Sequence, residues 1–254
     1  MIAVSFILIL TASYQVNDTQ VPIVELAQTG DRVLVVVAHP DDEVLGCFGT
    51  VARLIKEGYE AYTLILGEGK TSRDEERDID NKQGEIAILN NEIQNANNVI
   101  GIKKVFVESF PDNRFDSVDL LDIIKVISKV KDEVKPDIIF THYEHDLNID
   151  HQITYKAVVT ATRPMQDECV KEIYSFEILS STEWNYPISF SPDTYYDISN
   201  TIELKIKSMK EYASELCEYP HPRSIEGIGL NAKYQGMRVG KKDVEAFKII
   251  RAIK

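Results

Sequence analysis

The chain has 254 residues, of which 44% are hydrophobic and 27% are charged, as in an ordinary globular protein. This composition excludes collagen-like, low-complexity and wholly disordered chains, and the length allows one large α/β domain. Asp and Glu number 41 against 28 Lys and Arg, so the net charge of −13 would repel nucleic acid or an anionic membrane surface. We therefore predict that nucleic acid is not a partner.

The N-terminal segment and the cysteines bear on location. The apolar run over residues 2–10 is too short to span a bilayer, and no basic residue precedes Arg32, unlike in a signal peptide. We predict no stable membrane insertion and interpret residues 1–31 as an extension, either a buried strand or a misplaced start, before a single domain over 32–254. A cleaved or anchoring signal is the alternative. Three widely spaced cysteines suit neither a disulfide framework nor metal-binding pairs, and favour the cytoplasm.

After residue 31, short β-rich runs alternate with helix-length amphipathic stretches, the pattern of a parallel sheet with crossover helices. Strands are predicted over 33–38, 61–66, 104–108, 137–141 and 173–179. Helices are predicted over 46–56, from the end of the loop at 67–78 to about 98, over 120–134, after 151, and over 202–216 and 242–253. The expected fold is α/β, a Rossmann-like three-layer sandwich with a mostly parallel sheet, carrying the region beyond 165 as a C-terminal appendage.

The first polar cluster directly follows the first predicted strand. Ligands of open parallel sheets bind outside the carboxyl ends of the strands, where this chain has His39, Pro40, Asp41, Asp42 and Glu43. A helix beginning here would direct its N-terminal dipole at the carboxylates, and His39 and Asp42 are spaced to converge on one metal ion. The alternative is that the carboxylates cap the helix and His39 is a polar loop residue.

The second cluster follows the strand that is predicted to end at residue 141. Three of the five histidines, His142, His145 and His151, fall within residues 142–151. Catalytic zinc keeps three protein ligands and leaves a fourth place for water. His39, Asp42 and one of these histidines would complete such a site, with a remaining carboxylate as the base. The alternative is a polar loop with exposed histidines.

The two clusters carry a family resemblance. The sequence A-H-P-D-D-E at 38–43, with H-D-x-N-x-D-H at 145–151, resembles the LmbE-like, or PIG-L, family of zinc-dependent N-acetyl-sugar deacetylases. FPDNRFD at 110–116, SSTEWN at 180–185 and PHPRS at 220–224 extend the resemblance from residue 32 to the C-terminus.

The resemblance implies a role for several residues. His39, Asp42 and His151 would bind one Zn²⁺ per chain, although other divalent first-row metals suit the same donors. Asp41 would be the general base that takes a proton from the attacking water. Asp150 would be a carboxylate beside a ligand histidine that fixes its tautomer and orientation.

One position departs from the family pattern. Many members have a histidine where this chain has Asn148, and that histidine is thought to stabilise the oxyanion or to supply a proton. Asn148 can donate a hydrogen bond but cannot act as a general acid. His145, His142 or protonated Asp41 are the alternatives for that role.

Substrate contacts are expected from loops at the same sheet edge and from the C-terminal region, with surface or structural roles as the alternative. The candidates are Arg73, Asp112, Asn113, Arg114, Tyr143, His221 and Arg223. The predicted function is a zinc hydrolase that removes acetyl from a small-molecule N-acetylamino sugar of the GlcNAc type, linked to a nucleotide, a lipid or another aglycone. The alternatives are an amidase acting on a thiol–sugar conjugate and a non-catalytic Rossmann-like protein that binds sugar or nucleotide. A homo-oligomer is compatible with the sequence.

Overall fold

A computed structural model describes residues 31–72 and 77–254, and its core is one seven-stranded sheet in the order β3-β2-β1-β4-β5-β7-β6. The strands are β1 (Arg32–Val37), β2 (Glu60–Gly67), β3 (Lys104–Phe110), β4 (Ile138–His142), β5 (Glu172–Phe176), β6 (Thr194–Asp197) and β7 (Val244–Ala252). Strands β1 to β5 run parallel to one another, and β7 runs antiparallel to both β5 and β6.

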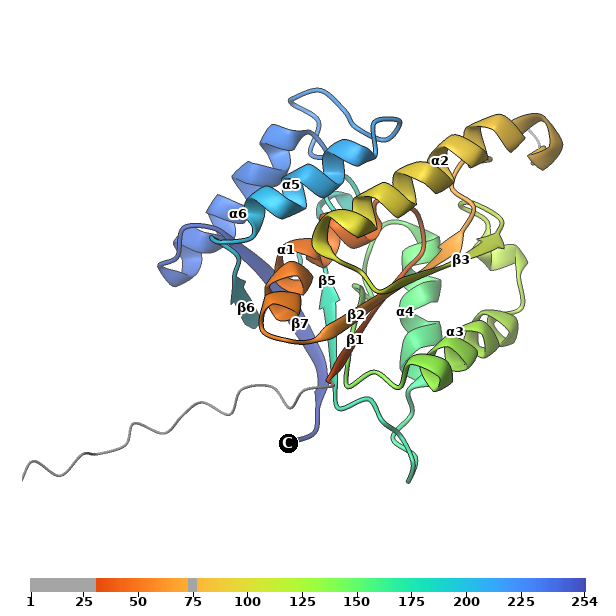
Figure 1. Ribbon diagram of the computed structural model, residues 1–254, viewed down its shortest axis with the longest axis horizontal. Helices are drawn as coiled ribbons and strands as arrows, with labels where there is room; N and C mark the ends of the chain where they lie inside the picture. The colour runs from red at the N-terminus through yellow and green to blue at the C-terminus, as the bar shows by residue number, and fades with distance from the viewer. Residues whose placement is uncertain (1–30, 73–76) are drawn as a thin grey trace, which may run out of the picture.

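Helices cover both faces of this sheet (Figure 1). They are α1 (Asp42–Lys56), α2 (Ile79–Ile100), α3 (Leu120–Val134), α4 (Ile149–Ala161), α5 (Ile202–Glu211) and α6 (Ile225–Val239). Successive side chains of a strand point to opposite faces, so Val33, Val35 and Val37 of β1 join the core beneath α1 and α2. Leu34 and Val36 join the core on the side of α3 and α4. The α/β sandwich with a mostly parallel sheet is therefore confirmed.

The C-terminal region differs most from the sequence prediction. The predicted helix over 242–253 is wrong, because this segment is strand β7, inserted between β5 and β6. Residues 244–247 are all buried, as both faces of an internal strand are covered. β6 and α6 were not predicted, and α5 ends at Glu211 instead of 216. The region beyond 165 thus adds strands to the sheet as well as helices.

Near the site, α1 begins at Asp42, four residues before the predicted start at 46. The polar cluster after β1 therefore lies at the helix N-terminus itself. The proposed extension lies outside the described residues except for Asp31, so the boundary at 31 stays a prediction. No helix in the described part of the chain is long and apolar enough to cross a membrane.

A buried ion pair joins the C-terminal region to α1. The side chains of Lys205 and Glu245 are 6% and 5% exposed, with Nζ and Oε1 at 2.6 Å. Glu245 also accepts hydrogen bonds from the backbone N–H groups of Gly49 and Thr50, and Lys205 donates to the carbonyl of Leu45. Both charges are thus fully engaged by α1, the helix whose N-terminus carries Asp42.

We expect Lys205→Met to lower the free energy of unfolding by about 3–5 kcal/mol, because it leaves the carboxylate of Glu245 buried without its cation. Urea unfolding followed by circular dichroism measures the change. The matched control is Lys125→Met, since Lys125 pairs with Asp122 at an exposed position of α3. An equal, small effect of both substitutions would contradict a structural role for the buried pair.

Candidate active site

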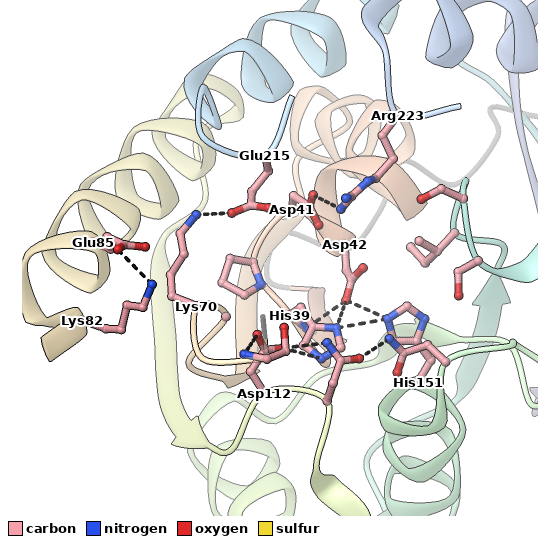
Figure 2. Close-up of a pocket in the computed structure, with 18 residues that line it drawn as sticks. His39, Asp41, Asp42, Lys70, Lys82, Glu85, Asp112, His151, Glu215 and Arg223 are labelled. Carbon is pink, nitrogen blue, oxygen red and sulfur yellow. Dashed lines mark hydrogen bonds and ion pairs between the residues drawn. The ribbon is translucent and has the colours of Figure 1, made fainter. Parts of the chain in front are cut away.

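A cavity of about 290 Å³ opens at the carboxyl ends of the parallel strands, where the sequence predicted it (Figure 2). The loops after β1, β2 and β3 and the N-terminus of α4 form one part of its wall. The first turns of α2, residues 178–181 and the segment between α5 and α6 form the rest. The lining residues are His39, Pro40, Asp41, Asp42, Gly69, Lys70, Ser72, Lys82, Glu85, Asp112, Asn113, Asn148, His151, Ile178, Ser180, Ser181, Glu215 and Arg223.

Three potential ligand atoms form a small triangle in this cavity. His39 Nδ1 lies 3.2 Å from His151 Nε2 and 3.5 Å from Asp42 Oδ2, and the latter two atoms are 3.3 Å apart. Ligands bound to zinc at about 2.0–2.1 Å in a tetrahedron are separated by about 3.3–3.4 Å. The triangle therefore fits one metal ion, with three protein ligands and room for a fourth, and the residues are those named from the sequence.

The turn before α1 holds two of these atoms in place. The backbone N–H of His39 donates to Asp42 Oδ2 at 2.8 Å. Between them, Asp41 has φ 91°, a left-handed conformation that is costly for a residue with a side chain. This conformation of Asp41 closes the turn so that the side chain of Asp42 reaches the backbone of His39.

Carboxylates behind the histidines orient both rings. Asp150 Oδ2 lies 3.0 Å from His39 Nε2, and its other oxygen accepts a hydrogen bond from the backbone of Phe115. Asp146 Oδ1 lies 3.1 Å from His151 Nδ1. Carboxylates in these positions fix the tautomer that leaves the opposite nitrogen free for a metal.

Asp146 was not assigned a role from the sequence, although it lies in the quoted H-D-x-N-x-D-H motif. It is fully buried and accepts hydrogen bonds from the hydroxyls of Ser181 and Thr182 and from the backbone of Asn148. The two hydroxyls come from a segment far along the chain, so no local spacing signalled this network.

The electrostatics of the cluster favour positive charge. Burial lowers the pKa of His151, but Asp42 and Asp146 outweigh burial and raise the pKa to about 9. Burial likewise opposes the charged form of His39, yet hydrogen bonds to Asp150 and Asp42 raise its pKa well above the ordinary value. Burial disfavours ionised Asp42, but the charge of His151 and hydrogen bonds from His151 and His39 hold its pKa well below the usual range. A cation between these side chains is therefore stabilised.

His142 supports the cluster without offering it a ligand atom. Its Nε2 accepts a hydrogen bond from the backbone N–H of Ala38 at 2.9 Å, which occupies the lone pair that would face Asp42. Its ring stacks on that of His151 with centroids 3.9 Å apart and an interplanar angle of 12°. Burial, followed by the charge of His151, lowers the pKa of His142 well below the ordinary value, so the ring is neutral.

Asp41 lies next to this cluster and is 2% exposed. Arg223 Nη1 donates to its Oδ2 at 3.0 Å, as the dashed line in Figure 2 shows. Burial raises the pKa of Asp41 well above the usual range, and Arg223 acts in the opposite direction. The PHPRS segment therefore reaches the pocket through Arg223.

The remaining predicted residues fall into three groups. Asp112, Asn113 and Asn148 line the cavity. Asn148 is the N-cap of α4, where its Oδ1 accepts from the backbone of Asp150 and its Nδ2 donates to Asn113. Arg73 lies outside the described residues.

The side chains of the third group do not line the cavity. They are Arg114, Tyr143, His145 and His221. The ring of His145 is half exposed beside Glu144, and Tyr143 packs on Phe190. His221 accepts a hydrogen bond from the backbone of Arg223, so it supports the segment that delivers the guanidinium.

Comparison with known proteins identifies the family. The PIG-L family, described as GlcNAc-PI de-N-acetylase, matches residues 34–162, just over half of the chain. The chain belongs to the PIG-L family. Its matched region holds the three candidate metal ligands, Asp41 and both orienting carboxylates, whereas Arg223 and the segment around it lie beyond the match.

Individual relatives share less than a third of their residues with this chain. A probable N-acetyl-alpha-D-glucosaminyl L-malate deacetylase 2 from Bacillus cereus is 28% identical over 186 residues, 72% of this chain and 83% of that protein. The solved N,N'-diacetylchitobiose deacetylase from Pyrococcus horikoshii has a TM-score of 0.69 at 20% identity, covering 87% of this chain and 84% of the other. GalB, a 4-carboxy-2-hydroxymuconate hydratase from Pseudomonas putida, has a TM-score of 0.65 at 20% identity, covering 88% and 98%. The fold thus carries more than one activity.

Proposed function

We propose that the protein is a metal-dependent hydrolase that removes the acetyl group from an N-acetylamino sugar of the GlcNAc type, with one Zn²⁺ per chain. The observation that carries this proposal is the triangle of His39 Nδ1, Asp42 Oδ2 and His151 Nε2 beside the buried carboxylate of Asp41. The family match and the relatives named as deacetylases support the acetyl amide as the bond that is hydrolysed.

Each residue has a part in amide hydrolysis. A zinc ion held by His39, Asp42 and His151 would supply a Lewis acid that polarises the acetyl carbonyl and lowers the pKa of a water. Asp41 accepts the proton of the attacking water, and Arg223 holds the carboxylate of Asp41 in place. Burial of Asp41 makes it a stronger proton acceptor than an exposed carboxylate, because its pKa is raised.

The leaving amine needs a proton, and we assign its delivery to protonated Asp41. His145 and His142, the alternatives drawn from the sequence, do not line the cavity, and the amide of Asn148 has no acidic proton. We therefore expect His145→Ala to leave both kcat and metal content near those of the wild type in an acetate-release assay. A large fall in kcat with unchanged metal content would move the role to His145.

The two alternative functions make different predictions. An amidase acting on a thiol–sugar conjugate would use the same residues but would release an acyl group other than acetate. A non-catalytic binding protein would need neither the base nor the ligands, yet His39, Asp41, Asp42 and His151 are all present and line the same cavity. The presence of the complete set supports hydrolysis.

Product analysis tests the proposal. The zinc-loaded protein is incubated with N-acetylglucosamine, N,N'-diacetylchitobiose, N-acetylglucosamine 1-phosphate and N-acetylglucosaminyl malate, and acetate and free amine are both quantified. Equal amounts of the two products from at least one sugar are expected. Absence of acetate from every sugar, together with cleavage of a thiol–sugar amide, would favour the amidase.

We also propose a cytoplasmic location. Cys47, Cys169 and Cys217 are all free thiols in the described structure, which suits a reducing compartment. The proposed partner is a small-molecule sugar.

A further inference from the structure

An ion pair occupies the side of the cavity opposite the metal ligands. Lys70 and Glu215 both line the cavity, and their side chains are in direct contact and only 12% and 9% exposed. In Figure 2 their side chains lie on the side of His39 that is away from His151. Neither residue belongs to a motif that was read from the sequence.

Both members of the pair are held firmly in position. Lys70 follows Gly69, which has φ +77° and whose place leaves no room for a Cβ, since one would lie 2.8 Å from Pro40 Cδ. Lys70 also donates to Ser214 Oγ at 2.9 Å. The loop after β2 therefore brings the ammonium group of Lys70 to Ser214 and Glu215.

Glu215 is fixed by its chain neighbours. Ser214 donates from its backbone N–H and its hydroxyl to the two carboxylate oxygens of Glu92 on α2. The hydroxyl of Tyr212 donates to the buried Glu43 of α1 at 2.5 Å. This segment lies beyond residues 34–162, the part that matches the family, so it is a feature of this chain's C-terminal region.

The charge of the cavity indicates which kind of ligand fits. Among the described lining residues, five carboxylates (Asp41, Asp42, Glu85, Asp112 and Glu215) face three cations (Lys70, Lys82 and Arg223). One divalent ion at the candidate metal site would balance the remaining charge. The lysines, moreover, already contact carboxylates, Lys70 with Glu215 and Lys82 with Glu85. An anionic group at this end would be repelled by those carboxylates, whereas a neutral group would not.

We propose that Lys70 and Glu215 bind hydroxyl groups of a neutral sugar and so select a substrate without an anionic aglycone. A hydroxyl group both donates and accepts hydrogen bonds, so it can donate to Glu215 and accept from Lys70. Hydrogen bonds to charged groups in a shielded pocket are the stronger kind. The inference rests on the proposed function, because it places the acetylated end of the same sugar at the metal ligands.

Two substitutions test the inference with neutral sugars. Glu215→Gln and Lys70→Met are each expected to raise the KM for N-acetylglucosamine about tenfold, with kcat near the wild-type value, because they remove binding that is equal in the ground and transition states. Glu133→Gln is the control, since Glu133 forms an exposed pair with Lys104 away from the cavity.

A panel of 3-, 4- and 6-deoxy analogues provides the readout that a structural role would not move. For the analogue that lacks the bound hydroxyl, wild type and Glu215→Gln are expected to have the same KM. N-acetylglucosamine 1-phosphate and N-acetylglucosaminyl malate are expected to be poorer substrates than N-acetylglucosamine. Equal effects of Glu215→Gln across the whole panel, or an unchanged KM with a lowered melting temperature, would overturn the inference.

Calorimetric binding separates this inference from the proposed function. Sugar is titrated into the zinc-loaded protein carrying Asp41→Asn, with and without Glu215→Gln. Weaker binding caused by Glu215→Gln supports the hydroxyl site even if the wild type releases no acetate. Acetate release with a KM that Glu215→Gln leaves unchanged contradicts the site alone, and neither binding nor turnover of any neutral sugar contradicts both.

Discussion

Asp41→Asn is expected to lower kcat by about 10²–10⁴-fold while zinc content stays at the wild-type level. The substitution keeps the size of the side chain but removes the proton acceptor beside the metal ligands. It leaves the triangle of His39, Asp42 and His151 intact, because no ligand atom belongs to Asp41. Acetate release under saturating sugar and metal analysis of the same sample measure both quantities.

The control for this substitution is Asp122→Asn on α3, where the carboxylate is exposed and remote from the cavity. It should change neither kcat nor metal content. Near-normal turnover by Asp41→Asn would remove Asp41 from the mechanism, and loss of zinc from that variant would make Asp41 part of the metal site instead.

His151→Ala is expected to lose most of the bound metal, with at least a 100-fold fall in metal affinity, and to lose activity with it. Even residues behind the ligands commonly contribute 10–100-fold to metal affinity, and His151 supplies one of the three ligand atoms. Its ring also stacks on His142, so the substitution leaves a void next to the His142 ring.

Mass spectrometry of metal content and zinc titration with a competing chelator measure this loss. His145→Ala is the matched control, because it removes a histidine that precedes α4 and does not line the cavity. Full occupancy in His151→Ala would mean that the third ligand is another residue.

The parallel half of the fold was predictable because its signals are local. β1 is a continuous run of buried apolar residues, and α3 has the spacing of an amphipathic helix, so both were found within one residue of their bounds. The prediction of a helix over 242–253 failed for a physical reason. The burial of this segment depends on β5 and β6 pairing with either side of β7, which is tertiary information that spacing alone does not contain.

The grouping of the candidate ligands was also predictable. His39, Asp42 and His151 were named from two clusters that follow parallel strands, and the structure places their potential ligand atoms close to one another. The role of Asp146 was not predicted, because its hydroxyl partners Ser181 and Thr182 lie far along the chain. The pair of Lys70 and Glu215 was not predicted, because neither residue belongs to a motif. The two come into contact only when the segment after α5 packs against the loop after β2.

We expect one metal ion, held by His39, Asp42 and His151, to be required for sugar deacetylation. The most direct measurement titrates Zn²⁺ into chelator-treated, metal-free protein while acetate release from an accepted N-acetyl sugar is followed. No release is expected without metal, and the rate should rise to a plateau at one equivalent per chain. Undiminished release by metal-free protein, or no release at any zinc concentration, would contradict this metal requirement.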